Sequence, residues 1–298
     1  MPFIREIRIR DPFVVSSGGS YYLYGSTDQN TWRGPGTGFD VYVSSGDLRF
    51  FEGPFPVFRP PENFWAASNF WAPEVYSYRG GWYMFASFKP KKGRRGTAVL
   101  KSGGGLMGPF ASWSAGPLTP SEWECLDGTF YLDRQGKPWM VFCHEWVQAG
   151  NGEICAVRLS GDLRDASGPP ELLFRAADAP WAKALKGRTP ESFVTDGPNL
   201  YTGGDGALVM IWSSFGADGR YRIGAAVSES GLVTGPWRQR EKPIFEEDGG
   251  HGMLFRSVEG KLYLALHSPN ESPKERPLFL EIIDRGGGDL FPAGLKIA

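Results

Sequence analysis

Short apolar segments joined by glycine turns recur along the whole chain. An apolar segment, a turn that contains glycine and an aromatic-rich segment follow one another five times. The paired segments are 13–15 with 21–24, 75–76 with 82–85, 130–132 with 139–142, 200–201 with 208–212, and 254–255 with 262–266. Short segments rich in aromatic and β-branched residues and bounded by turns are typical of β-strands. The pattern therefore predicts an all-β protein made of repeated antiparallel hairpins.

The hairpins recur at a fairly regular distance. Their turn glycines are 62, 55, 70 and 54 residues apart, at Gly19, Gly81, Gly136, Gly206 and Gly260. A third apolar segment follows each hairpin, and in four units a Gly-Pro pair then ends the unit. Repeated meanders of this length are typical of β-propellers, whereas two packed sheets would explain the strands but not the repeat. We therefore predict one domain over 1–298, a five-bladed β-propeller with blades near 11–55, 70–110, 125–170, 195–240 and 250–298.

Composition narrows the classes of function. The 41 glycines and 24 prolines suit a turn-rich chain, and 41% hydrophobic residues suffice for a packed core. A formal net charge of −1 argues against nonspecific binding to nucleic acid or to anionic membranes. The basic run at 89–95 is interpreted as a solvated loop, with contact to a polyanion as the alternative. The apolar runs are too short for a transmembrane helix.

The cysteines bear on the compartment. Cys125, Cys143 and Cys155 show no metal-site spacing and are odd in number. With an N-terminus that lacks an apolar leader, they predict a cytoplasmic protein with reduced, mostly buried thiols. A cleaved signal peptide replaced by an initiating Met would give the same sequence.

Charged residues head the first strand of each unit. The first strand of a propeller blade lines the central channel, so the side chains at its head are expected to meet at one mouth of that channel. Counted back from each turn glycine, these positions are Asp11, Glu74, Asp127, Asp196 and His251. The second strands run back to the same mouth and are expected to place on its rim Asp28, His144 with Glu145, Ser213 with Ser214, and His267 with Ser268.

Carboxylates that converge in this way indicate a functional site. Like charges in one pocket oppose folding unless a cation is bound or the groups differ in protonation. Glycoside hydrolysis uses the second arrangement, with one protonated acid and one ionised base or nucleophile. For a single carboxylate the alternative is a strand-end cap, but a shared position in four units favours a site.

Five motifs occur in the order found in a known family. They are Asp11-Pro12, Trp71-Ala72-Pro73-Glu74-Val75, Leu126-Asp127-Gly128-Thr129-Phe130, Thr195-Asp196-Gly197-Pro198 and Gly250-His251-Gly252. With them the chain resembles glycoside hydrolase family 43, the five-bladed arabinofuranosidases, xylosidases and arabinanases, over essentially its whole length. The resemblance implies hydrolysis by a single displacement that inverts the anomeric carbon.

The resemblance also implies roles for the carboxylates. Asp11 is expected to be the general base that activates water, and Asp127 to tune the pKa of the general acid and to orient it. The family's acid is the Glu of a Thr-Glu-Gly-Pro motif, and Asp196 stands in its place here. Aspartate is one methylene shorter, and ~1 Å of misplacement can cost on the order of 100-fold in rate. Either the strand compensates, or Glu145 serves as the acid, or the site is degenerate and non-catalytic.

Four residues are expected to bind substrate. Trp71 is a candidate platform for stacking on a sugar face, with core packing as the alternative. Arg276 resembles an arginine that contacts substrate in some members of the family, with a surface ion pair as the alternative. Asp28 and Glu145, on the predicted rim, complete the set.

The fifth strand head carries a histidine instead of a carboxylate. His251 resembles the family's Gly-His-Gly histidine deep in the channel, beside a hydrated calcium or another cation. A hydrogen-bonded structural histidine is the alternative. Glu74 matches a family position that is structural and is not counted among the catalytic residues.

The sequence therefore predicts a glycosidase, an arabinofuranosidase or xylosidase. It is expected to release terminal L-arabinofuranosyl or D-xylosyl units from plant-derived oligo- or polysaccharides, with no required cofactor and no nucleic-acid or membrane partner. The alternatives are a carbohydrate-binding propeller that has lost catalysis and a related five-bladed glycoside phosphorylase. The sequence does not set the oligomeric state.

Overall fold

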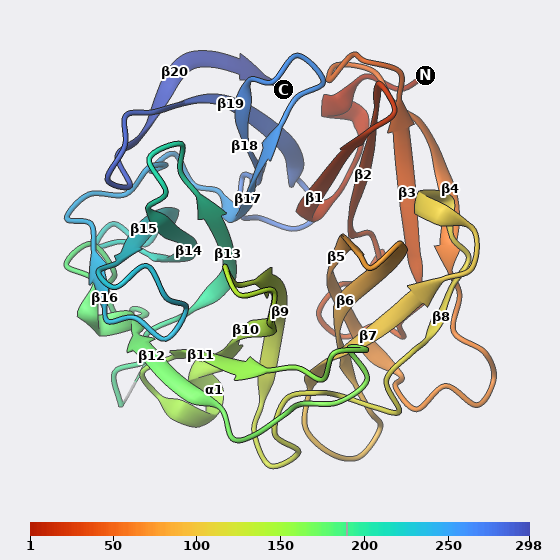
Figure 1. The fold of residues 1–298 in the computed structure, drawn as a ribbon, viewed down its shortest axis with the longest axis horizontal. Helices are drawn as coiled ribbons and strands as arrows, with labels where there is room; N and C mark the ends of the chain where they lie inside the picture. The colour runs from red at the N-terminus through yellow and green to blue at the C-terminus, as the bar shows by residue number, and fades with distance from the viewer. Residues whose placement is uncertain (189) are drawn as a thin grey trace.

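The computed structural model describes residues 1–188 and 190–298 and confirms the five-bladed β-propeller. Within these residues, twenty strands form five antiparallel sheets of four strands each. Figure 1 shows the sheets arranged as blades around a central axis, with β1, β5, β9, β13 and β17 innermost. Each blade is a simple meander, so its strands succeed one another outward in chain order.

The elements follow the repeat closely. The blades consist of β1 (Arg10–Ser17), β2 (Ser20–Ser26), β3 (Phe39–Ser44) and β4 (Glu52–Phe58); β5 (Ser68–Tyr78), β6 (Gly81–Lys89), β7 (Gly96–Ser102) and β8 (Phe110–Ser112); β9 (Cys125–Leu132), β10 (Pro138–His144), β11 (Glu153–Arg158) and β12 (Glu171–Arg175); β13 (Asp196–Thr202), β14 (Leu208–Phe215), β15 (Tyr221–Ser228) and β16 (Trp237–Gln239); and β17 (Gly250–Arg256), β18 (Leu262–Ser268), β19 (Arg276–Asp284) and β20 (Leu290–Ile297). The described helices are short: η1 (Ile4–Glu6), η2 (Gly105–Met107), α1 (Trp146–Ala149) and η3 (Ala176–Asp178). None of them has the length and apolar character needed to cross a membrane.

The fourth, outermost strand of each blade corrects the sequence interpretation. The Gly-Pro pairs do not end the units: Gly53-Pro54 lies inside β4, and the other three pairs lie within one residue of the start of β8, β12 and β16. The sheets therefore span 10–58, 68–112, 125–175, 196–239 and 250–297, beyond several predicted limits. Outer strands carry few buried residues, as in β4 with five of its seven residues not buried, so the hydrophobic pattern fades there.

The core lies between blades. One apolar cluster joins the first blade to the second and the fifth, and three further clusters join blades two and three, three and four, and four and five. The interface between the first and second blades is rich in aromatic rings, with Phe39 of β3 and Phe88 of β6 packed edge to face at 5.8 Å between ring centres. Burial of each such side chain stabilises the fold by roughly 1.5–3 kcal/mol. Each inner strand is thus held in place by its neighbours on both sides.

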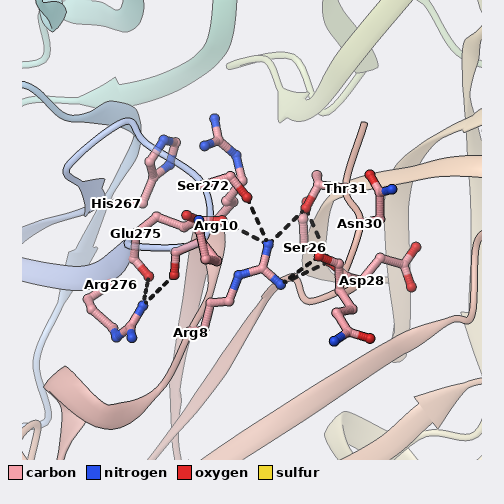
Figure 2. A network of polar contacts seen from close by, with 12 residues as sticks. Arg8, Arg10, Ser26, Asp28, Asn30, Thr31, His267, Ser272, Glu275 and Arg276 are labelled. Carbon is pink, nitrogen blue, oxygen red and sulfur yellow. Dashed lines mark hydrogen bonds and ion pairs between the residues drawn. The ribbon is translucent and has the colours of Figure 1, made fainter. Parts of the chain in front are cut away.

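Polar contacts close the ring between the first and last blades, because no strand is shared between the two ends of the chain. The Arg8 guanidinium donates to Glu275 Oε1 at 3.0 Å and to Ser272 Oγ at 3.2 Å (Figure 2). It also donates to the carbonyl oxygen of Asp28 at 3.1 Å. Glu275 is fully buried, so this ion pair is shielded from water on its acidic side. The network therefore ties the loop after β2 to the loop between β18 and β19.

Candidate active site

A β-bulge stands at the same place in the innermost strand of every blade. The pairing register between the first and second strands is interrupted at residues 11–12, 72–73, 127–128, 197–198 and 251–252. The first residue of each bulge has a positive φ: Asp11 (53°), Ala72 (47°), Asp127 (56°), Gly197 (51°) and His251 (48°). A bulge bends the strand and re-aims a side chain. These five residues, which we call the bulge residues, are the structurally equivalent set.

This register corrects two of the expected equivalences. Glu74 pairs with Phe85 one step after its bulge, and Asp196 pairs with Ser213 one step before its own. The bulge residue precedes the turn glycine by 8 residues in the first blade and by 9 in the other four, whereas Glu74 and Asp196 precede theirs by 7 and 10. Their charge, and not their spacing, favoured them as equivalents of Asp11. Asp11, Asp127 and His251 are equivalent, as the sequence predicted.

The backbone of each bulge residue is held by the blade that precedes it. For four of the five bulge residues the acceptor is a side chain at the end of the second strand of that preceding blade, opposite the residue before that blade's own bulge. Three of these acceptors are serine hydroxyls: the N–H groups of Ala72, Asp127 and His251 donate to Ser26, Ser87 and Ser213 at 2.8, 2.8 and 2.9 Å. For Asp11 the acceptor is His267 Nδ1 at 3.2 Å. We call the second-strand residues the acceptor ring; its fifth position is Cys143, opposite Leu126.

A cavity of about 360 Å³ is lined by residues from all five blades. The bulges bring Asp11, Asp127 and His251 to its wall, and Asp196 joins them from the start of β13. Its aromatic wall consists of Trp32, Trp71, Trp146, Phe215 and Tyr221. Carboxylates and aromatic faces in one concave site suit the binding of a polar ligand with apolar faces, such as a sugar.

Asp11 lies in surroundings that favour its charged form. Burial alone raises the pKa of this carboxyl, but His251, Arg10, His267 and Ser26 together outweigh burial and lower the pKa below its usual value. The Ser26 hydroxyl donates to Oδ2 at 2.6 Å, and His251 Nδ1 lies 3.3 Å from Oδ1. The Asp11 carboxylate is therefore ionised over the neutral range.

Asp196 lies in the opposite kind of surroundings. Burial first, and then the nearby Asp127 carboxylate, raise the pKa of Asp196 to about 7, although the Tyr221 hydroxyl donates to Oδ2 at 2.9 Å. Burial, followed by Asp11, also raises the pKa of Asp127. The N–H of Gly197 donates to Asp127 Oδ2 at 3.0 Å, so the backbone beside Asp196 is bonded to its carboxylate neighbour. Two carboxyls with opposite proton affinities can act as a base and an acid within one site.

A second set of contacts holds Trp71 and Glu145 on the cavity wall. The Arg95 guanidinium lies over the Trp71 ring at 4.4 Å and donates to Glu145 Oε2 at 2.8 Å. The Trp71 indole donates to the carbonyl oxygen of Thr31 at 2.7 Å. Burial raises the pKa of Glu145 although Arg95 opposes it. The ion pair with Arg95 favours the charged form of Glu145 and burial favours the protonated form, so Glu145 stays the predicted alternative acid.

Two residues that are expected to bind substrate lie outside the wall of this cavity. Among the described residues, neither Asp28 nor Arg276 lines the cavity. The Asp28 carboxylate accepts hydrogen bonds from the backbone and hydroxyl of Thr37, because the loop after β2 folds back over it. The Arg276 guanidinium donates to the carbonyl oxygens of Arg5, Pro273 and Glu275. Arg276 begins β19, the third strand of its blade, which lies away from the axis (Figure 1). Both residues are therefore part of the ring closure.

The surroundings of His251 do not offer a direct metal site. Its Nδ1 faces Asp11 Oδ1 at 3.3 Å and Asp127 Oδ2 at 3.6 Å. Within the described ranges, no group of three or more His, Cys, Asp or Glu side chains has the arrangement to hold a metal ion. Both carboxylates also accept hydrogen bonds, from Ser26 and from Gly197. The residues present therefore do not fit a cation bound directly by protein ligands.

Glu74 lies in the channel one step beyond the bulge residues. The Tyr76 hydroxyl donates to its carboxylate, and burial raises the pKa of Glu74 to about 7. The Tyr76 and Thr129 side chains both form hydrogen bonds with the Glu74 carboxyl. Glu74 is not among the described residues that line the cavity.

Several cavity residues were missed from the sequence. They are Arg10, Thr31, Trp32, Trp146, Tyr221 and Asn270. Arg10 precedes the first bulge, and Trp146 follows Glu145, so adjacency to a predicted site residue was the available signal for both. Trp32 and Asn270 lie in loops, where no periodic pattern of the sequence indicates a place in the cavity. Trp32 is 54% exposed, a large apolar surface of the kind that marks a binding site.

Comparisons with known proteins agree with this geometry. The family model described as "Glycosyl hydrolases family 43" matches residues 2–284. An endo-arabinase from Bacteroides thetaiotaomicron VPI-5482 is 39% identical to this chain, with a TM-score of 0.87 over 96% of this chain and 99% of that one. A search of curated proteins finds no match.

More distant structures share the fold. An endo-1,4-beta-xylanase from Bacteroides thetaiotaomicron VPI-5482 is 21% identical, with a TM-score of 0.75 over 99% of this chain and 96% of that one. An exo-1,5-alpha-L-arabinanase from a bovine ruminal metagenomic library is 16% identical, with a TM-score of 0.72 over 98% and 99% of the two chains.

Proposed function

Because this chain belongs to glycosyl hydrolases family 43, we propose that it releases terminal pentose units from plant-derived oligo- or polysaccharides with inversion of the anomeric carbon. The observation that carries the proposal is the pair Asp11 and Asp196, two carboxyls that line one cavity in opposite electrostatic surroundings. L-arabinofuranosyl is the first candidate and D-xylosyl the second, since the relative that is 39% identical is named an endo-arabinase. Release of terminal units is supported by the shape of the site, a cavity lined by residues from all five blades.

The proposed reaction is a single displacement. Asp11 takes a proton from water as the water oxygen attacks the anomeric carbon, and Asp196 gives its proton to the departing glycosidic oxygen. The anomeric carbon–oxygen bond breaks as the new one forms, and the protons of both carboxyls then re-equilibrate with solvent. Asp127 keeps the proton on Asp196 through like-charge repulsion. Trp71 and Trp32 are proposed to contact the sugar.

Water and two carboxyls suffice for this reaction, so we propose that no cofactor is required. A structural calcium held through water near His251 stays a prediction, which metal analysis of the purified protein tests. The cytoplasmic location also stays a prediction. The three cysteines are buried and unpaired in the structure.

The first experiment compares natural and activated substrates. Arabino- and xylo-oligosaccharides and the matching aryl glycosides are assayed with wild type, Asp11→Ala and Asp196→Ala. Asp11→Ala is expected to abolish activity on both classes with the fold intact. Asp196→Ala is expected to lose on the order of 100-fold or more on oligosaccharides but far less on aryl glycosides, whose leaving groups need little protonation.

Several outcomes would contradict the proposal. Equal losses on both substrate classes would remove Asp196 from the acid role, and NMR detection of a retained anomer would exclude the single displacement. A ladder of oligomers from linear arabinan, without early monosaccharide, would replace terminal release by internal cleavage. Turnover that depends on phosphate would indicate a phosphorylase, and sugar binding without turnover a binding protein.

A further inference from the structure

The acceptor ring departs from serine at two of its five positions. Blades one, two and four use Ser26, Ser87 and Ser213, and each hydroxyl accepts the N–H of the next bulge residue. The two departures are His267, which precedes the bulge of Asp11, and Cys143, which precedes the bulge beside Asp196. The ring thus changes only where the next strand carries the proposed base or acid.

Cys143 stands where three other blades have a serine acceptor, and the Thr195 side chain is the hydrogen-bond partner of its thiol. Its side chain is fully buried at the end of β10, in the place that serine takes in three other blades. A thiol sulfur is a much weaker hydrogen-bond acceptor than a hydroxyl oxygen. The N–H of Gly197, which corresponds to those bonded to serine elsewhere, donates to Asp127 Oδ2 at 3.0 Å. Of the five bulge N–H groups, this one reaches a carboxylate in the cavity.

This hydrogen bond bears on where a proton resides. Asp127 and Asp196 are both buried and repel each other, so the pair titrates as a unit and tends to keep one proton. A donated N–H stabilises the charged form of the carboxylate that accepts it. The bond from Gly197 therefore favours charge on Asp127 and the proton on Asp196. The other titratable or charged groups around the pair are Asp11, Glu74, Arg95, Glu145, Tyr221 and His251.

We propose that Cys143 is a positioning residue of this glycosidase. Because its thiol is a weak acceptor, the Gly197 N–H donates to Asp127 instead, and this hydrogen bond stabilises the charge on Asp127 and keeps the proton on Asp196. The proposal rests on the acid role of Asp196 proposed above. Cys143 is buried and does not line the cavity, so its effect on proton transfer would act through the backbone N–H of Gly197.

The test restores the serine of the other blades. In Cys143→Ser the hydroxyl competes for the Gly197 N–H, Asp127 loses a hydrogen bond to its charged form, and the proton moves toward Asp127. We expect kcat on natural oligosaccharides to fall about 5- to 10-fold with KM unchanged, and the loss on activated aryl glycosides to be much smaller. Cys143→Ala removes the sulfur without adding an acceptor, so its kcat is expected to stay within about 2-fold of wild type. Cys155→Ser, a buried thiol on β11, controls for burial of a hydroxyl.

The dependence of kcat on pH gives a second test of the proposal. Weaker stabilisation of charged Asp127 makes the pair hold its last proton more tightly, so the alkaline limb stays in place or moves to higher pH in Cys143→Ser while the plateau falls. A purely structural defect would lower activity on both substrate classes and in Cys143→Ala as well. Equal kcat for Cys143→Ser and wild type, or a larger loss in Cys143→Ala than in Cys143→Ser, would overturn the proposal.

A readout without activity separates this proposal from the proposed function. In protein labelled with ¹³C at the aspartate carboxyls, with signals assigned through Asp127→Asn and Asp196→Asn, Cys143→Ser is expected to move Asp127 toward its protonated shift at neutral pH and Asp196 away from it. Unmoved carboxyl signals would refute the role of Cys143 even if the enzyme hydrolyses pentosides. Shifted signals in a protein without hydrolytic activity would refute the proposed function alone.

Discussion

Asp11 and Asp196 show how surroundings give two carboxyls different chemistry. Both lie on one cavity wall, but Asp11 faces His251, the Arg10 guanidinium and the Ser26 hydroxyl, whereas Asp196 faces a second carboxylate. The pKa of Asp11 is lowered and that of Asp196 is raised to about 7. Hydrolysis that needs both groups is therefore expected to decline as pH rises through about 7, where the acid loses its proton.

The raised pKa of Asp196 also has a cost in stability. Between its unfolded pKa of about 4 and its folded pKa of about 7, the folded state binds more protons, so the free energy of unfolding falls as pH rises through this window. Asp196→Asn removes the buried charge and is expected to gain on the order of 2 kcal/mol over wild type at pH 8 and almost nothing at pH 4. Thermal unfolding at the two pH values measures this, with the exposed Asp165→Asn as the control. An equal gain at both pH values would mean that the charge of Asp196 is not the cause.

At the scale of the element, the bulge in each innermost strand places the reacting groups. Positive φ is tolerated by Asp and Gly and is unfavourable for Ala, yet Ala72 adopts 47° in the second blade. The hydrogen bond from its N–H to Ser26 helps to hold that conformation. A bulge kept in all five strands, including one where the residue is unsuited to it, indicates that the geometry belongs to the fold and not to single residues.

Gly197 tests how tightly the fourth bulge is packed. A Cβ added there would lie 2.8 Å from the Cγ and Cδ2 atoms of His251, and φ is positive. Gly136 also has a positive φ, but a Cβ there meets nothing within 4 Å. Gly136→Ala is expected to cost about 1 kcal/mol of stability without loss of kcat. Gly197→Ala is expected to cost more and to lower kcat by on the order of 10-fold or more, because His251 or the adjacent Asp196 must shift; equal kcat values for the two variants would contradict this.

At the scale of the molecule, the ring closes through side chains. Glu275 is fully buried and pairs with Arg8, whose guanidinium also reaches the loop that carries Thr31 and Trp32. These contacts between the first and last blades, which we call the seam, therefore support Thr31 and Trp32 of the cavity wall. They also support Asn270 of the last blade, which accepts a hydrogen bond from Arg10 at 2.8 Å. Closure of the ring and the shape of the cavity depend on the same contacts.

Breaking the seam is expected to destabilise the whole propeller. Glu275→Ala removes the buried partner of Arg8 and is expected to cost about 3 kcal/mol, as buried pairs do when one charge is left alone. Glu271→Ala breaks an exposed pair with Lys274 in the same loop and is expected to change stability by less than about 0.5 kcal/mol. Urea unfolding of both variants measures the difference. A similar small effect for both would show that the seam contributes little.

The sequence by itself determined the architecture and much of the site. Hydrophobic periodicity and the spacing of turn glycines are local properties, and they predicted five blades whose inner strands bring Asp11, Asp127, Asp196 and His251 together. The structure decided what depends on register and on neighbouring blades. The pairing register shows that Ala72 and Gly197, which carry no charge, stand at the bulges, and that Glu74 and Asp196 lie one step to either side of them. A one-residue slip moves a side chain to another face of a strand, so this register decides which groups face one another.

Contacts between blades were also beyond the sequence. The carboxylate of Asp28 turned out to be bound by Thr37, and Arg276 by backbone carbonyls at the seam, while Trp32 and Asn270 entered the cavity from loops. Loop positions follow no period, and their partners lie in blades that are distant along the chain. The proton affinities of the acid and base likewise arise from burial and from groups on other blades, which only the folded ring brings within reach.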